Sequence, residues 1–246
     1  MKVAEKAVSN TIYLALNWLT LTGLSFLYWV IAGKLLLPSE YGKATTAYQI
    51  MFFLGSIANL GLGFAVSKVI PELIMKKQER KIPTIIKFSL KIALSIALVL
   101  AILLVLSTPL LNKKLGFNLR DTVFIALGLL FAQLSGFFSR VWYGYQNMKK
   151  IWINSMINQI TKLAVASFLI YSGYKYFGPI AGLVAMYFVS FLLYFSPKII
   201  RDGTRYNTRH LFYELAIPAF FANVFVMIFN NTQYIILSLM KNTEST

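Results

Sequence analysis

Residues 84–106 read TIIKFSLKIALSIALVLAILLVL, a run made mostly of aliphatic side chains. About 20 apolar residues are enough to carry a helix across roughly 30 Å of hydrocarbon, at about 1.5 Å per residue. Inside hydrocarbon every backbone amide needs a partner within the protein, so such a run must be a helix or a barrel strand. The apolar residues are continuous and do not alternate with polar ones, which excludes a barrel strand. This run therefore predicts a transmembrane helix.

Six further stretches of the same kind fill most of the remaining chain. They span residues 9–37, 43–69, 121–146, 150–173, 179–200 and 211–240. The first run is too long for the core of a signal peptide, so it is predicted to be a retained span. Hydrophobic residues make up 58% of the chain and charged residues 13%, with a mean hydropathy of +0.66. The predicted fold class is all-α, a multi-spanning transmembrane bundle of six helices followed by a seventh.

The net charge of +16 comes from 24 Lys and Arg residues against 8 Asp and Glu. In a soluble protein this excess would suggest nucleic acid as a partner. Here most cations lie in short loops beside helix ends, where the anionic headgroups of the bilayer attract them, so no nucleic acid is expected. With the N-terminus in the cytoplasm, the inner loops carry 15 cations and the outer loops 7. Cytoplasmic loops retain positive charge, which predicts a multi-pass protein of the cytoplasmic membrane with its N-terminus inside.

The motifs of enzymes and metal sites are missing from the sequence. The chain has no cysteine, and its single histidine, His210, lies in a loop. No P-loop, HExxH or GxSxG pattern occurs. We therefore expect no catalytic residue, no metal site and no cofactor, and the chain is not expected to be an enzyme.

Two polar stretches divide the chain. Residues 71–83, PELIMKKQERKIP, predict either a short helix at the cytoplasmic interface or a solvated loop whose cations only set the topology. Residues 201–210, RDGTRYNTRH, form the longest polar stretch after the sixth run. They predict a cytoplasmic linker between a six-helix domain, 1–200, and the first helix of a second bundle, 211–246.

Lys162 is the most unusual polar residue within a predicted span. It lies 12 residues after Lys150, or about 18 Å along a helix axis, which places it near the middle of the bilayer. Ser155, Asn158 and Gln159 precede it at i−7, i−4 and i−3, so all four are expected on one helix face. A charge at this depth costs about 2.5 kcal/mol or more, and such a face normally lines a bundle interior or cavity. Lys162 is interpreted either as an amine that binds an anionic ligand or as a structural lysine bonded to neighbouring helices.

Weaker candidates for a polar cavity lie on other predicted spans. Arg140 follows Gln133 and Gly136 on one face of the span 121–146, and it either contributes to the cavity or extends to the cytoplasmic interface. Lys87 and Lys91, near the start of their span, are expected to extend to the interface in the same way. The remaining candidates form polar stripes that serve either a ligand or contacts between helices: Asn17, Gln49 and Asn59.

No carboxylate lies deep within a predicted span. Glu214 and Asp121 are near helix ends, and the other acidic residues are in loops or at the termini. Antiport driven by protons or sodium usually needs an intramembrane carboxylate, since it supplies both affinity and a switchable charge. Basic residues without acidic partners instead favour an anionic cargo.

Three stretches carry a resemblance to a known family: AGKLLLPSEYGKATTAYQI at 32–50, ANLGLGFAVSKVIPEL at 58–73 and LFYELAIPAFFANVFVMIFNN at 211–231. They resemble polysaccharide-exporting flippases, the Wzx-like members of the multidrug/oligosaccharidyl-lipid/polysaccharide (MATE-like) exporter superfamily. The first two are similar to the family's first two helices, with Asn59 where an acidic residue is frequent. The third, which includes Pro218, is similar to the start of the family's second half.

This resemblance implies 12 to 14 helices in two lobes around a central cavity. The present chain would then hold the N-terminal lobe and the first helix of the second. The implied function is a flippase that moves lipid-linked oligosaccharide or polysaccharide precursors across the membrane by alternating access. Under this resemblance the lipid bilayer and the lipid-linked oligosaccharide are the implied partners, and the glycosyltransferases or polymerase of a glycan-export pathway are candidates for further ones. The alternatives are a cation-coupled multidrug antiporter of the same fold and a non-transporting membrane scaffold for glycan assembly.

Overall fold

The computed structural model describes residues 2–201 and 203–226. Within these residues the protein is all-α, without a strand, which confirms the predicted helical bundle. The helices are α1 (Lys2–Leu35), α2 (Pro38–Asn59), α3 (Leu62–Met75), α4 (Ile82–Leu106), α5 (Thr108–Leu115), α6 (Leu119–Gly144), α7 (Met148–Leu169), α8 (Phe177–Tyr194) and α9 (Thr208–His210). Short 3₁₀ or π turns join them: η1 (Glu79–Lys81), η2 (Ile170–Tyr174), η3 (Pro197–Ile199) and η4 (Leu211–Ala216).

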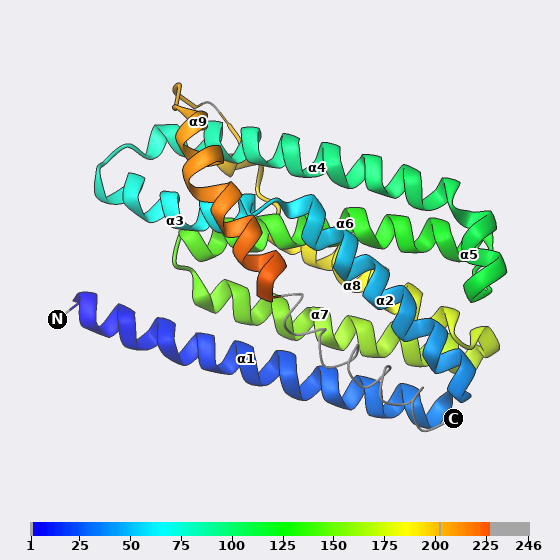
Figure 1. Cartoon of the computed structure of the whole chain (residues 1–246). Helices are drawn as coiled ribbons and strands as arrows, with labels where there is room; N and C mark the ends of the chain where they lie inside the picture. Colours follow the sequence, from blue (N-terminus) through cyan, green and yellow to red (C-terminus); the bar gives the residue numbers. More distant parts are fainter. Residues whose placement is uncertain (1, 202, 227–246) are drawn as a thin grey trace, which may run out of the picture.

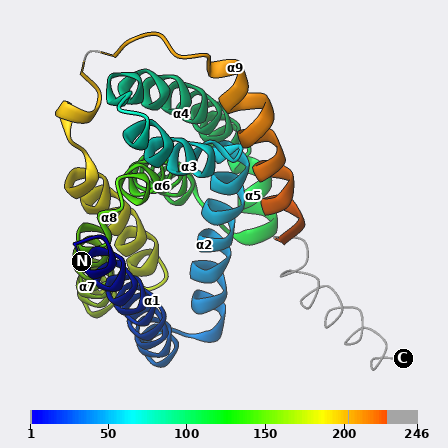
Figure 2. The ribbon, with the colours of Figure 1, turned by 90° about the vertical axis from the view of Figure 1, so that its left-hand side faces the viewer.

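The long helices run side by side, and the chain passes back and forth along the bundle (Figure 1). α6 lies at the centre and packs against α2, α3, α4 and α8. α7 packs against α8 on one side and α1 on the other, so α1 joins the bundle mainly through α7 (Figure 2). Apolar residues fill the contacts around α6, including the fully buried Phe137, Ile125 and Leu129.

By length and apolar composition, four helices of the described chain can cross a membrane: α1, α4 with η1, α6 and α8. α2 and α3 together make a fifth candidate, bent by 51°. The helix expected at 150–173 is present as α7, but it does not qualify by composition. Its buried polar residues, which include Asn154, Gln159 and Lys162, lower its hydropathy. The last predicted span is helical from residue 208 to 226, and its residues 227–240 lie outside the described chain.

The second predicted span was expected to be continuous from 43 to 69, and this was wrong. Leu60 and Gly61 adopt left-handed backbone angles, with φ of 45° and 69°, which a right-handed helix cannot continue. Gly61 also has no room for a side chain. A Cβ there would lie 2.2 Å from the carbonyl oxygen of Ala216 and 2.7 Å from the backbone nitrogen of Phe220. The break between α2 and α3 is therefore where the helical stretch 208–226 packs.

Of the two interpretations of the polar segment 71–83, the separate interfacial helix is wrong, and residues 76–78 form an exposed turn. Pro71 lies inside α3, which continues to Met75 before the chain turns into η1. The apolar residues of this segment are thus the last turn of a long helix, and no separate interfacial helix forms there. One helix was not expected: α5, which has Pro109 in its first turn and ends at a left-handed Gly116.

Replacement of Gly61 by alanine is expected to destabilise the fold. The new Cβ requires a left-handed backbone and collides with the backbone of residues 216 and 220, so we expect a loss of about 1–3 kcal/mol. Thermal unfolding in detergent measures this effect. Gly23→Ala is the matched control, because nothing lies within 4 Å of a Cβ at Gly23 in α1. Equal unfolding temperatures for the two variants would contradict the close packing at the break.

Candidate functional site

Lys162 lies in the contact between α7 and α1. Its side chain is only 4% exposed. Its Nζ donates a hydrogen bond of 3.2 Å to Ser25 Oγ and lies 4.4 Å from the centre of the Tyr28 ring. Ser25 Oγ in turn donates to Gln159 Oε1 at 3.3 Å. A hydroxyl, an amide and an aromatic face therefore surround the amine.

A third helix, α8, also contacts this site. A Cβ on Gly182 would lie 2.9 Å from the carbonyl oxygen of Lys162 and 2.9 Å from the Cβ of Ala166, so α8 approaches the α7 backbone closely. Small residues permit such contacts between helices in membranes. Tyr28 OH also donates to the carbonyl oxygen of Pro179 in α8, at 3.5 Å. Three helices thus converge on Lys162.

Further polar contacts follow the same junction of α1 with α7, and we call this junction the α1–α7 seam. Trp152 Nε1 donates to Thr20 Oγ1 at 3.2 Å. Asn17 is 6% exposed, and its Oδ1 has no hydrogen-bond partner within the described chain. The seam consists of Asn17, Thr20, Ser25 and Tyr28 from α1 with Trp152, Gln159 and Lys162 from α7.

Asn158 was expected on the same face as Lys162, but its contacts are with another group. Its Nδ2 donates to Asn154 Oδ1. Asn154 Nδ2 donates to the carbonyl oxygen of Ser190 in α8 at 3.2 Å, and Ser190 Oγ donates back to Asn154 Oδ1 at 3.2 Å. The polar residues of α7 therefore differ in their neighbours. Gln159 and Lys162 contact α1, Asn154 contacts α8, and Asn158 contacts Asn154 within α7 itself.

Arg140 and Asn59 lie outside the α1–α7 seam, beside each other at the start of α3. A Cβ on Gly63 would lie 2.9 Å from Arg140 Cγ and 3.3 Å from Asn59 Oδ1. Asn59 Oδ1 accepts from the Gly63 amide at 3.0 Å and so satisfies one of the first amides of α3, while Arg140 is exposed. Arg140 is four residues from the end of α6, so it lies roughly 15 Å nearer that end of the bundle than Lys162.

Gln49 lies apart from both places. It is exposed on α2, and no hydrogen bond joins it to the seam within residues 2–201 and 203–226. The structure therefore separates the residues that the sequence proposed for one cavity. Lys162, Gln159 and Asn17 lie together in the seam, and Asn59 lies with Arg140 beside α3.

Sequence reasoning missed Ser25 and Tyr28, the direct partners of Lys162. Both are common residue types in a membrane helix, so neither is conspicuous by itself. Their spacing from Asn17, at i+8 and i+11, places all three on one face of α1. This shared face could have indicated them.

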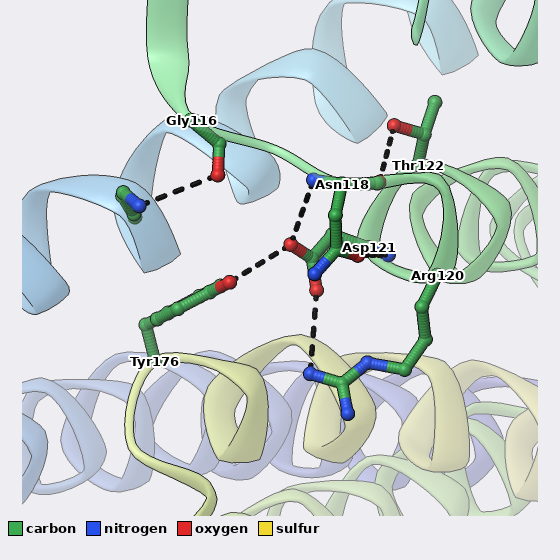
Figure 3. Close-up of polar contacts among 7 residues, drawn as sticks. Gly116, Asn118, Arg120, Asp121, Thr122 and Tyr176 are labelled. Atoms are coloured by element: carbon green, nitrogen blue, oxygen red, sulfur yellow. Dashed lines mark hydrogen bonds and ion pairs between the residues drawn. The ribbon is translucent and has the colours of Figure 1, made fainter. Parts of the chain in front are cut away.

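The acidic residue Asp121 lies at one end of the bundle, within a group of polar contacts (Figure 3). Its Oδ2 accepts from the Asn118 amide at 3.1 Å and from Tyr176 OH at 2.9 Å. Arg120 Nη2 lies 3.7 Å from its Oδ1, and the Asp121 amide donates to Asn118 Oδ1 at 2.9 Å. Asn118 and Asp121 thus form a capping box at the start of α6. As the sequence indicated, this carboxylate is at a helix end and not deep in a span.

The surrounding contacts make this group a brace between helix ends. Lys43 Nζ, from α2, donates to the carbonyl oxygen of Gly116 at 3.3 Å and lies 4.9 Å from the centre of the Tyr176 ring. Lys175 Nζ is 3.5 Å from Glu40 Oε1. Burial raises the pKa of the Tyr176 hydroxyl, and its hydrogen bond to Asp121 raises it further. The phenol therefore stays protonated and keeps donating to the carboxylate.

The long apolar helices and the buried polar seam define a multi-pass α-helical membrane protein. Residues 7–246 match the family model described as "Polysaccharide biosynthesis protein". Because the match covers nearly the whole chain, the protein belongs to this polysaccharide biosynthesis family, which confirms the resemblance found in the sequence. A comparison with curated proteins gives no match.

Replacement of Tyr176 by phenylalanine is expected to weaken the brace. It removes the donor to Asp121 Oδ2, and the loss of a hydrogen bond to a charged group costs about 1.5–3 kcal/mol. Thermal unfolding in detergent measures the change. Tyr171→Phe is the control, because Tyr171 is 77% exposed. If both variants unfold at the same temperature, the Tyr176 bond does not stabilise the fold.

Proposed function

We propose that this protein is a flippase that moves a lipid-linked oligosaccharide from the inner to the outer leaflet of the cytoplasmic membrane. The observation that carries this proposal is the buried amine of Lys162. Within residues 2–201 and 203–226, no carboxylate lies within ion-pair distance of it. Membership of the polysaccharide biosynthesis family supports a glycan precursor as the cargo.

A buried charge without a counter-ion has an energetic consequence. A lysine at mid-membrane costs about 2.5 kcal/mol or more, and one hydroxyl and one aromatic face offset this cost only in part. An anionic group that reached the amine would be attracted more strongly than in water, because the dielectric constant of the surroundings is low, and this attraction offsets part of the cost of removing both charges from water. The pyrophosphate of a lipid-linked sugar has the required charge, while its lipid tail remains in the bilayer.

Access to the amine requires α1 to separate from α7. α1 contacts the bundle mainly through α7, and a single hydrogen bond joins Lys162 to Ser25. Movement of α1 would expose the amine without disturbing the apolar contacts around α6. In alternating access such movements open a central site first to one side and then to the other. Arg140, exposed near one end of the bundle, would be a first contact for the headgroup.

The positions of the cations support the proposed orientation. The basic segments around η1, the start of α7 and the start of α9 all lie at the end of the bundle where the chain begins (Figure 1). This end is the cytoplasmic one if positive charge is retained inside. The proposal includes no catalytic step and no cofactor.

The main test is Lys162→Met, which keeps the length of the side chain and removes its charge. We expect transport of a polyprenyl pyrophosphate sugar in reconstituted vesicles to fall at least about tenfold, which corresponds to about 1.4 kcal/mol of lost cargo interaction. Lys162→Arg should retain part of the activity. Lys91→Met is the control, because Lys91 is exposed on α4.

Transport at the normal rate by a folded Lys162→Met variant would show that the amine does not bind the cargo. Efflux of an organic cation driven by a sodium or proton gradient would instead favour the antiporter. A scaffold would show neither activity, and Lys162→Met would change only its stability.

A further inference from the structure

A groove runs between α7 and α8 on a face away from the seam, and we call it the α7–α8 groove. It encloses about 270 Å³. Its lining residues are Asn147, Lys149, Lys150, Ile153, Asn154, Ile157 and Leu193. Asn147, Lys149 and Lys150 lie at the start of α7, and the rest of the lining is mostly apolar, with Asn154 as its one polar member. The groove therefore changes from charged to apolar along its length.

The apolar part of the groove belongs to a surface that faces hydrocarbon. Ile153 is 42% exposed, and Ile157 and Leu193 are 38% exposed each. The same stripe of α7 continues through Ile160, 54% exposed, and Phe168, 70% exposed. A stripe of exposed aliphatic and aromatic side chains on a helix of a membrane protein contacts lipid chains.

The mouth of the groove carries two cations, Lys149 and Lys150. Lys150 Nζ lies 3.6 Å from the centre of the Trp142 ring, which holds its side chain at the mouth. Across the described ranges, no carboxylate lies within ion-pair distance of either lysine. Asn147 caps α7 by accepting from the Lys150 amide at 3.1 Å, and the positive end of the helix dipole adds to the charge of the mouth.

We propose that the α7–α8 groove binds one anionic phospholipid from the leaflet at this end of the bundle. The phosphate would lie between Lys149 and Lys150, and one acyl chain would lie along Ile153, Ile157 and Leu193. Charge complementarity at the mouth and apolar walls at hydrocarbon depth together select a molecule with a charged head and a long tail. A free phosphate would make no use of the apolar walls. This lipid is a bound component of the membrane and is distinct from the cargo.

The experiment titrates the purified full-length protein with phosphatidylglycerol or phosphatidylcholine in detergent and counts the retained lipids by native mass spectrometry. We expect wild-type protein to retain phosphatidylglycerol preferentially. The double variant Lys149→Gln/Lys150→Gln should bind it about fivefold to tenfold more weakly, since each basic residue contributes to the attraction of an anionic headgroup. The control, Lys76→Gln/Lys77→Gln, removes two cations at the same end that do not line the groove.

A second variant tests the apolar walls and keeps both charges. Ile157→Trp fills the groove and should reduce phosphatidylglycerol binding while thermal unfolding stays close to that of the wild type. Equal binding by the wild type and the Lys149/Lys150 variant would overturn the proposal, as would an equal loss in the Lys76/Lys77 control. Displacement of phosphatidylglycerol by an equimolar polyprenyl phosphate would also overturn it, because the groove would then hold the carrier lipid. The experiment measures lipid binding and not transport. A negative result would therefore contradict the proposed lipid site and leave the proposed flippase function unaffected.

Discussion

The contact of Lys162 with α1 is the interaction on which the arrangement of three helices depends. Hydrocarbon offers no water to solvate an ammonium group, so the amine must find polar partners inside the protein. Ser25 and Tyr28 supply them from α1. Gly182 allows α8 to approach the backbone on the other side, because any larger residue would collide with the Lys162 carbonyl. One residue thereby relates three helices: Lys162 of α7 contacts α1 through its side chain and α8 through its backbone.

Asp121 and Lys162, two buried charges of the described chain, differ in how far they are satisfied. Asp121 accepts hydrogen bonds from the Asn118 amide and the Tyr176 hydroxyl and lies near Arg120, so its charge is used in the fold. Lys162 has only neutral partners within the described part of the chain. A group that is already balanced by opposite charge gains little from a ligand, whereas an unbalanced one gains much. This difference is why the lysine, and not the aspartate, is the basis of the proposed transport site.

The positions of the helices were largely predictable, and their interruptions were not. α4 and α6 begin and end within two residues of the apolar runs 84–106 and 121–146. The break at Leu60 and Gly61 falls inside an equally apolar run, where hydropathy carries no signal. It is explained by the helical stretch 208–226, whose backbone packs against Gly61. Such a contact joins residues more than 150 positions apart, so no local pattern reports it.

The sequence by itself determined that the chain is a bundle of membrane-crossing helices, because hydrocarbon admits only backbones that satisfy their own hydrogen bonds. It also identified Lys162 as a charge in an unfavourable place. Only the tertiary structure decided which neighbouring residues each polar side chain of α7 contacts. Two polar residues of α7, Asn154 and Lys162, contact different helices, α8 and α1, because their difference in angle around the helix axis selects different partners.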